Sequence, residues 1–335
     1  MIRVARTVHR QQGVALIMVL LAMALVVMLV SGMTQQQSVR VFRTGHYLAQ
    51  QQALSIALGS EAFAQQVLIK DLEQDKEDGT LVDSPDEFWN QYAAVLPVDD
   101  RGVVEVQIDD LGGRINLNNL VNATTEAQQL TRKRVARLLE LLDISSVHVE
   151  ALIDWVDADD QTINAYGAED GVYLQQDPPY RAANQPFVNV SELRLIDGMT
   201  EDAYQRLLPH VTVVPVSGLG INVNMASGPV LQALDERLTA QQAAAILAKR
   251  KEGRFESLVD FLALPEFAGL GMTAAGLSLQ TYFFEVVSQI TYDDRTTSLV
   301  SLMFRNPEEN EVLTVQRDSG QKNRITKQPF AVPEG

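Results

Sequence analysis

A run of twenty uncharged, mostly apolar residues, VALIMVLLAMALVVMLVSGM, occupies positions 14–33 of this 335-residue chain. As an α-helix rising about 1.5 Å per residue, the run would be roughly 30 Å long, which matches the hydrocarbon core of a bilayer. An ordinary secretory signal has a shorter apolar core, of about 7–15 residues, followed by a small-residue cleavage site. The run therefore predicts a transmembrane helix that stays attached to the protein.

Basic residues around the run predict its orientation. Arg3, Arg6 and Arg10 precede it, whereas only Arg40 and Arg43 follow closely. The positive-inside rule then favours a cytoplasmic N-terminus and places the rest of the chain outside the cytoplasm.

Composition excludes several classes of function. The net charge is −16, and residues 1–43 hold five arginines and no acid, so the remainder carries −21 and would be repelled by nucleic acid and anionic lipid. The chain has no cysteine, which excludes disulfides, thiol nucleophiles and cysteine-bound zinc. Its length leaves room for two or three compact units beyond the anchor.

The junction between the leader and the apolar run is distinctive. A short basic leader ends at Gly13, and the helix begins at Val14 without a spacer, which resembles the class III leader of type IV pilins and type II secretion pseudopilins. The resemblance implies cleavage between Gly13 and Val14 by a prepilin peptidase and N-methylation of Val14, although that family usually has phenylalanine or methionine after the cut. A plain single-pass anchor is the alternative, and it requires neither the glycine nor the missing spacer.

The fifth residue after the expected cut is Met18, where the family usually has glutamate. A carboxylate in the bilayer costs a few kcal/mol unless it is paired, and in pilins its partner is the N-terminal amine of a neighbouring subunit. A subunit at the tip of a filament has no neighbour above it. The missing glutamate and the length of the chain together resemble the type II secretion protein K family, the minor pseudopilins of the pseudopilus tip.

Beyond the membrane run, hydrophobic and small residues recur at alternating steps of four and three, which predicts that the helix continues to about Lys70. They are Phe42, His46, Ala49, Ala53, Ile56, Ser60, Phe63 and Val67. An acidic loop is expected from Asp71 to Asp86, followed by a short helix at 86–96.

Strand signals flank a long helical section. Residues 102–108 alternate as a strand does, and residues 282–292, 298–305 and 311–317 predict an antiparallel meander. The section between them predicts helices at 126–142, 147–156, 191–195, 201–208, 228–235, 240–251 and 257–264. The residues themselves predict a strand–helices–strand order.

The resemblance implies an α+β fold. A long N-terminal membrane-anchoring helix would pack on a pseudopilin-type antiparallel sheet, with a large all-α inserted domain of helix-hairpin-helix or SAM-like units. The expected divisions are a leader at 1–13, a transmembrane helix at 14–33, its continuation at 34–70, the first part of the head at 71–111, the insertion at 112–279 in two units (about 112–214 and 215–279), further strands at 280–320 and a flexible tail at 321–335.

Two segments, 190–207 and 221–255, resemble helix-hairpin-helix units, and Gly198 supplies the turn of the first. Such units often bind the DNA backbone through hairpin amides and nearby basic residues. Here the hairpins are acidic, and the one basic cluster, at 249–254, is typical of a solvated helix end. A helical packing module or partner surface is the favoured interpretation, with DNA binding as the alternative.

Residues 151–180 contain seven carboxylates and no lysine, arginine or histidine. Such carboxylates repel one another unless they are well solvated or share a cation. Calcium takes six to eight oxygen ligands in a flexible shell, and Gly167 and Gly171 would supply turns for a loop of this kind. The segment is not an EF-hand, because the positions that require glycine and glutamate hold Thr162 and Ala168.

The family resemblance also implies calcium in the helical domain, where it would be structural. The expected ligands are Asp154, Asp157, Asp159, Glu169 and Asp170, with Asp160 and Asn184 as further candidates. The alternative is a solvated acidic loop, which is the usual fate of a charge run.

A glycoside hydrolase is a further alternative, because paired carboxylates can hydrolyse glycosides. The sequence contains no nucleophile elbow, no phosphate-binding glycine loop and no HExxH motif, and its four histidines are scattered. We therefore expect no enzymatic activity.

By the resemblance, the chain is expected to be an inner-membrane minor pseudopilin with a periplasmic C-terminal domain, needed for pseudopilus assembly and protein export. Its implied partners are the other minor pseudopilins, the major pseudopilin and the prepilin peptidase, with exported substrates and the outer-membrane secretin as further candidates. A type IV pilus tip pilin is the near alternative, and a membrane-tethered nucleic-acid-binding protein is the distant one.

Overall fold

The computed structural model describes residues 13–121, 123–293, 295–320 and 325–331. Most of the expected leader, with Arg3, Arg6 and Arg10, lies outside the described residues. The chain divides into two compact units, residues 1–56 and 57–335, and each is described by itself.

In the first unit, helix α1 (Val14–Asp78) begins directly after Gly13, whose carbonyl accepts a hydrogen bond from Ile17 N at 3.1 Å. The helix therefore starts without a spacer, as the sequence indicates. It is long and apolar enough to cross a membrane, with a mean hydropathy of 3.0 over its most apolar 18 residues. Its length and composition fit the membrane anchor that the sequence predicts.

In the second unit, the last turns of α1 pack on a sheet through Ala57, Ala64, Leu68 and Leu72, all buried. The expected end near Lys70 is wrong, because α1 continues to Asp78 and stops at Gly79, whose φ is +73°. A left-handed glycine after the last helical residue is a common helix terminator. Residues 71–78 read as an acidic loop in the sequence, but they are helical because Leu72 and Asp75 face the protein interior.

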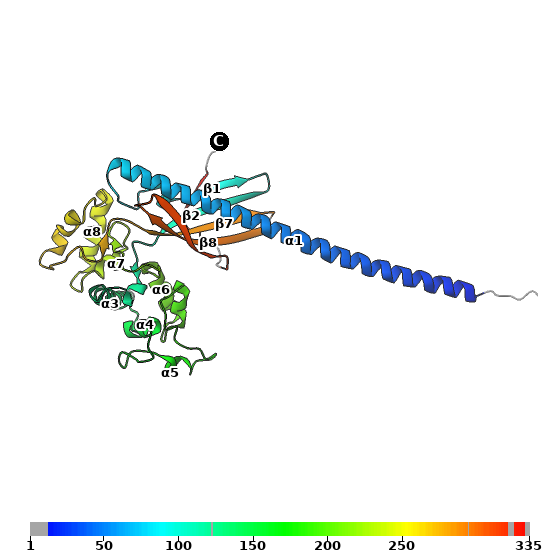
Figure 1. The fold of residues 1–335 in the computed structure, drawn as a ribbon, viewed down its shortest axis with the longest axis horizontal. Coiled ribbons are helices and arrows are strands. Elements are labelled where there is room, and N and C mark those ends of the chain that lie inside the picture. Colours follow the sequence, from blue (N-terminus) through cyan, green and yellow to red (C-terminus); the bar gives the residue numbers. More distant parts are fainter. Residues whose placement is uncertain (1–12, 122, 294, 321–324, 332–335) are drawn as a thin grey trace, which may run out of the picture. The chain divides into compact units, whose positions relative to one another are not determined.

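The sheet has six strands in the order β10-β1-β2-β7-β8-β9 (Figure 1). Neighbouring strands are antiparallel except β1 and β10, which are parallel. The strands are β1 (Tyr92–Val98), β2 (Gly102–Asp110), β7 (Phe283–Tyr292), β8 (Arg295–Asn306), β9 (Glu311–Asp318) and β10 (Gln328–Ala331). The predicted meander is confirmed as β7-β8-β9.

Two expectations for the head are wrong. The helix expected at 86–96 is only α2 (Phe88–Gln91), because the chain enters β1 at Tyr92 and buries Ala93. The tail is not entirely flexible, because β10 pairs with β1. Gln107 Oε1 holds the tail in place by accepting hydrogen bonds from the backbone N–H groups of Thr326 and Lys327, at 2.7 and 2.9 Å.

The helical section is inserted between β2 and β7, which pair directly with each other. Its helices are η1 (Leu117–Leu120), α3 (Thr125–Leu141), α4 (Val149–Val156), α5 (Asp170–Tyr173), η2 (Val190–Leu195), α6 (Glu201–Leu207), η3 (Leu208–His210), α7 (Gly228–Gln232), α8 (Ala240–Glu252), α9 (Leu258–Leu262) and η4 (Pro265–Phe267). They enclose one hydrophobic core that includes Leu138, Leu152 and Phe261. Figure 1 shows α3, α4, α6, α7 and α8 grouped apart from the sheet.

The insertion is not all-α, which corrects the expectation. Two short parallel strand pairs occur in it, β3 (Ile115–Asn116) with β4 (Val211–Thr212) and β5 (Ile221–Asn222) with β6 (Leu277–Ser278). Strands of two residues leave no alternation in a sequence to detect. Each pair joins the beginning and end of one half of the insertion.

Candidate functional site

The acidic segment forms a loop at 157–169 between α4 and α5. Helix α4 buries Leu152 and Trp155 in the core. The Trp155 ring packs edge-to-face on Tyr173 of α5, with ring centroids 5.1 Å apart, and Tyr180 stacks on Tyr173. Aromatic packing thus fixes both ends of the loop.

Four carboxylates converge at this loop. Asp157, Asp159 and Glu169 each offer one oxygen, and these oxygens lie within 4.8 Å of one another. Asp154, at the end of α4, is completely buried, and its Oδ1 accepts a hydrogen bond from Ile163 N at 3.2 Å. Asp154, Asp157, Asp159 and Glu169 are called the loop cluster below.

Several buried oxygens at this loop have no hydrogen-bond partner in the described part of the chain. They are Asp154 Oδ2, Asp157 Oδ1, Asn184 Oδ1 and both oxygens of Glu169. An unsatisfied buried acceptor costs about 1–3 kcal/mol, and more if it is charged, so native proteins rarely retain such a group of them. A set of oxygen donors of this kind fits a hard divalent cation such as calcium.

The pKa values of these carboxylates also favour the binding of a positive charge. Burial and, to a smaller extent, the charges of the neighbouring Asp157 and Asp154 carboxylates together raise the pKa of Glu169 to about 7. Burial likewise raises the pKa of Asp154 and of Asp157, and the charge of Asp159 adds to both. A bound cation would reverse these shifts, because it favours the ionised carboxylates.

The other sequence candidates are arranged differently. Asp170 is engaged elsewhere: one of its oxygens pairs with Arg181 Nη1, and the other accepts from Ala182 N at 3.1 Å. Asp160 Oδ1 accepts from Asn184 Nδ2 at 2.8 Å, which leaves Asn184 Oδ1 without a partner. Asn184 Oδ1 is therefore a candidate oxygen ligand, whereas Asp170 lies outside the loop cluster.

The two glycines of the loop differ in role. A Cβ on Gly167 would lie 2.0 Å from Asp154 Oδ2, so only glycine permits this approach of loop to helix. Gly171 lies inside α5 and not in a turn, contrary to expectation.

A second acidic group, which the sequence analysis missed, lies where α1, the following linker and α2 meet. Asp71, Asp83 and Glu87 offer oxygens within 4.8 Å of one another and are called the junction cluster below. Arg305 of β8 is buried among them; it pairs with both oxygens of Asp83 and with Asp71 Oδ2, the latter at 3.0 Å. No local sequence pattern reveals this group, because Arg305 is 222 residues away from Asp83.

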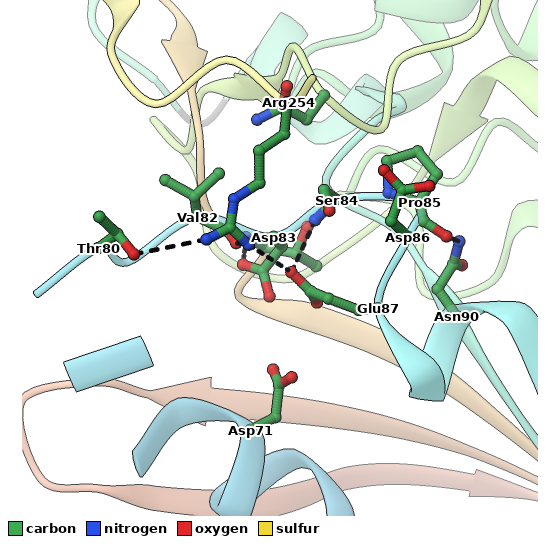
Figure 2. A network of polar contacts seen from close by, with 12 residues as sticks. Asp71, Thr80, Val82, Asp83, Ser84, Pro85, Asp86, Glu87, Asn90 and Arg254 are labelled. Atoms are coloured by element: carbon green, nitrogen blue, oxygen red, sulfur yellow. Dashed lines mark hydrogen bonds and ion pairs between the residues drawn. The ribbon is translucent and has the colours of Figure 1, made fainter. Parts of the chain in front are cut away.

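Figure 2 shows a second arginine, Arg254, that reaches the same group from the insertion. Its guanidinium contacts Val82 O at 3.4 Å and Thr80 Oγ1 at 3.5 Å, and it lies 3.8 Å from Glu87 Oε1. Burial raises the pKa of Asp71 to about 7. Burial, together with the charges of Asp71 and Asp83, raises the pKa of Glu87 to about 9. The junction cluster thus joins the head to the insertion through its own arginines.

Basic side chains of the two hairpin units form ion pairs and hydrogen bonds within the protein. Arg194 pairs with Glu201 at 2.9 Å, and Lys249 with Glu252 at 2.8 Å. Arg250 donates to the carbonyls of Val223 and Ala226. These contacts favour a packing module over a nucleic-acid surface.

Comparisons with known proteins agree with this architecture. Models of the family described as "Type II secretion system (T2SS), protein K" match residues 113–216, with the model of its first domain, and residues 221–280. The chain is 37% identical to type II secretion system protein K of Pseudomonas aeruginosa over 93% of both chains. It is 35% identical to the Klebsiella pneumoniae protein of that name, over 80% of this chain and 83% of the relative.

A solved structure is also similar. One chain of the crystal structure of the GspK-GspI-GspJ complex from the enterotoxigenic Escherichia coli type 2 secretion system superposes with a TM-score of 0.73 at 26% identity. The match covers 84% of this chain and all of that chain.

Proposed function

The chain belongs to the type II secretion system protein K family, and we propose that it acts as the minor pseudopilin at the tip of the pseudopilus. In that role it supports pseudopilus assembly and the export of folded proteins from the periplasm across the outer membrane. The observation that carries the proposal is the large helical insertion between the directly paired strands β2 and β7 of a head that also packs the end of α1.

The anchor helix supports the placement at the tip. Residues 14–33 contain no charged side chain, and Met18 stands where a subunit inside the filament would use a carboxylate to pair with its neighbour. A carboxylate without that neighbour would cost a few kcal/mol in the membrane. Met18 removes this cost for a subunit with nothing above it.

Processing at Gly13 is the first test of the proposal. Expressed with a prepilin peptidase, the full chain should yield a mature protein that begins at Val14 and carries one methyl group, as measured by intact mass. The matched variant Gly13→Val should keep its leader. An uncut wild-type leader, or a cut beyond Met33, would contradict the proposal.

The proposed partners are the sibling minor pseudopilins, because the structurally similar chain comes from a GspK-GspI-GspJ complex. The proposed location is the inner membrane, with a cytoplasmic N-terminus and a periplasmic C-terminal domain. The processed full chain in detergent should co-purify with the GspI-type and GspJ-type proteins of the same organism. Recovery of the chain alone from such a co-expression would contradict this assignment.

The loop cluster is proposed to hold calcium. Asp154, Asp157, Asp159 and Glu169 would supply carboxylate oxygens, and Asn184 its unpartnered Oδ1. When bound, the ion supplies the positive charge that offsets the repulsion among these carboxylates. The residues themselves connect the end of α4 to the start of α5, so the assembled loop braces this side of the insertion.

We also propose that the protein is not an enzyme. Family membership favours a structural role in secretion over a glycosidase, a type IV pilus tip pilin or a nucleic-acid-binding protein. The proposal predicts no hydrolysis of oligosaccharides by the purified chain in the presence of calcium, and measurable turnover that the variant Asp157→Asn abolishes would overturn it.

A further inference from the structure

Helix α3 carries a buried arginine without an acidic partner. Arg134 is 5% exposed, and burial lowers its pKa to about 10. Two other arginines of the helix, Arg132 and Arg137, pair with Glu150 and Glu140. Arg134 has no carboxylate within ion-pair distance among the described residues. A buried charge without a counter-charge is costly, so its retention calls for a reason.

The hydrogen bonds of Arg134 are only partly satisfied. Nη1 donates to Gly276 O at 3.0 Å and Nη2 to Ala275 O at 3.3 Å, whereas Nε has no partner. A guanidinium has five N–H donors, so three are left without an acceptor in the described part of the chain. Carbonyl oxygens share the hydrogen bonds but do not neutralise the charge.

Arg134 lines a cavity of about 260 Å³ between the two halves of the insertion. This volume lies just below the range of about 300–1,000 Å³ typical of small-molecule sites, which suits a ligand of few atoms. Thr131 and Asn119 line the same cavity and are also buried. Asn119 Oδ1 accepts from Gly218 N at 3.0 Å, while neither its Nδ2 nor Thr131 Oγ1 has a partner among the described residues.

The rest of the lining includes apolar side chains and the N-terminus of α3. Ile115, Leu130, Leu219 and Ile221 provide the apolar surface. The N-terminus of α3 also lines the cavity, through Thr124, Glu126 and Ala127, and the helix dipole there favours negative charge, although the Ala127 N–H already donates to Thr124 Oγ1 at 3.4 Å. Glu126, the other charged residue of the lining, is exposed to solvent.

We propose that this cavity binds a small organic carboxylate with a short apolar body. The carboxylate would accept hydrogen bonds from the free Nη donors of Arg134 and from Thr131 and Asn119, and the apolar body would contact Leu130 and Ile221. The ligand would supply the negative charge that Arg134 lacks. Binding would join the two halves of the insertion, because Arg134 belongs to the first half and Ala275 and Gly276 to the second.

The test uses the full chain in detergent and hexanoate as the probe, with the neutral isostere hexanamide as the matched control. Hexanoate should bind in isothermal titration calorimetry at least tenfold more tightly than hexanamide. The variant Arg134→Met should lose the preference for the carboxylate, whereas Arg137→Met, on the same helix but outside the cavity, should keep it. Thr131→Val, which preserves volume and fold, should weaken hexanoate binding about tenfold, as expected for one hydrogen bond to a charged group.

Three results would overturn the proposal. One is equal binding of hexanoate and hexanamide to the wild-type chain. Another is an equal loss of binding in Thr131→Val and Arg137→Met, which remains decisive even if Arg134→Met does not fold. The third is the absence of binding across acetate, butyrate, hexanoate and benzoate at concentrations up to the solubility of each.

Discussion

The loop cluster and the junction cluster each gather buried and partly exposed carboxylates but differ in how the charge is balanced. The junction cluster encloses Arg305 and is approached by Arg254, so arginines of the chain itself offset much of its charge, although Glu87 Oε2 is buried without a partner among the described residues. In the loop cluster no carboxylate forms an ion pair among the described residues, since Arg181 pairs with Asp170 instead, and four of its buried oxygens have no partner there. A cluster of carboxylates that contains its own arginines connects parts of the fold, whereas a cluster without arginines is suited to an external cation.

The largest expected effect follows from removing the internal cation. The variant Arg305→Met leaves Asp83, which is completely buried, without its partner and should lower the free energy of unfolding by about 3–5 kcal/mol. Urea unfolding of the full chain in detergent measures the change. Arg101→Met is the control, because Arg101 forms exposed ion pairs with Asp293 and Asp99 and a contact with Tyr292, and its loss should cost far less, about 1 kcal/mol. A loss below about 1 kcal/mol in Arg305→Met would show that the junction cluster does not depend on its arginine.

Removing calcium should have the next largest effect. With a dissociation constant of about 10⁻⁴–10⁻³ M, 10 mM calcium stabilises the folded protein by about 1.4–2.7 kcal/mol relative to a chelator. Thermal unfolding in calcium and in EGTA measures the difference, which corresponds to several degrees. Asp157→Asn should remove most of the difference, and Glu87→Gln should keep it. Coincident wild-type transitions in calcium and in EGTA would mean that the loop cluster is a solvated acidic loop.

The two clusters should also respond differently to pH. A carboxylate whose pKa is raised on folding binds more protons in the folded than in the unfolded protein, so stability falls as pH rises from about 4 to the folded pKa. In EGTA, stability should therefore fall from pH 5.5, up to about pH 7 for Glu169 and Asp71 and up to about pH 9 for Glu87, the pH values at which the folded protein loses these protons. Each group contributes at most about 1.4 kcal/mol per pH unit.

Calcium separates the two contributions. Excess calcium should cancel the Glu169 contribution near pH 7, because the ion binds the ionised carboxylates, and should leave the Glu87 contribution between pH 7 and 9. In thermal unfolding, Glu87→Gln should reduce the slope over the whole range from pH 5.5 to 9 and remove the fall that remains between pH 7 and 9. A stability in EGTA that rises steadily from pH 5.5 to 9 would contradict the raised pKa values.

The smallest effect is expected at Asp170, which the sequence pattern assigned to the calcium ligands. Asp170→Asn should change the calcium affinity less than twofold in a calorimetric titration, because its carboxylate is already held by Arg181 and Ala182 N. Its loss of stability should be about 1 kcal/mol or less, as for other largely exposed ion pairs. A tenfold loss of affinity would place Asp170 in the coordination shell.

The parts of the fold that the sequence predicted are those with a repeating pattern. The meander β7-β8-β9 and the helix α3 have clear periodicity, and the structure contains both close to the expected bounds. The end of α1, the strand β10 and the two-residue strands lack such a pattern, because their formation depends on contacts far away in the sequence. The expected stripe of α1 is also displaced by one residue at Ile56, Phe63 and Val67, because Ala57, Ala64 and Leu68 are the buried residues. Ser60 and Glu61 lie on the same face and have polar partners on the sheet.

The same distinction applies to the sites. The loop cluster was visible in the sequence because its carboxylates lie within sixteen residues of one another, Asp154 to Glu169, without a nearby basic residue. The junction cluster was not visible, since its acids are balanced by an arginine from a distant strand. Arg134 gave no signal either, because an arginine in a charged helix looks solvated until its burial is known.

A calorimetric titration of calcium into the EGTA-treated, dialysed full chain tests the contrast between the two clusters most directly. Our expectation is saturable binding to the wild-type chain, which Asp157→Asn abolishes and Glu87→Gln preserves. Absence of binding to the wild-type chain, or a loss in Glu87→Gln with retention in Asp157→Asn, would contradict it.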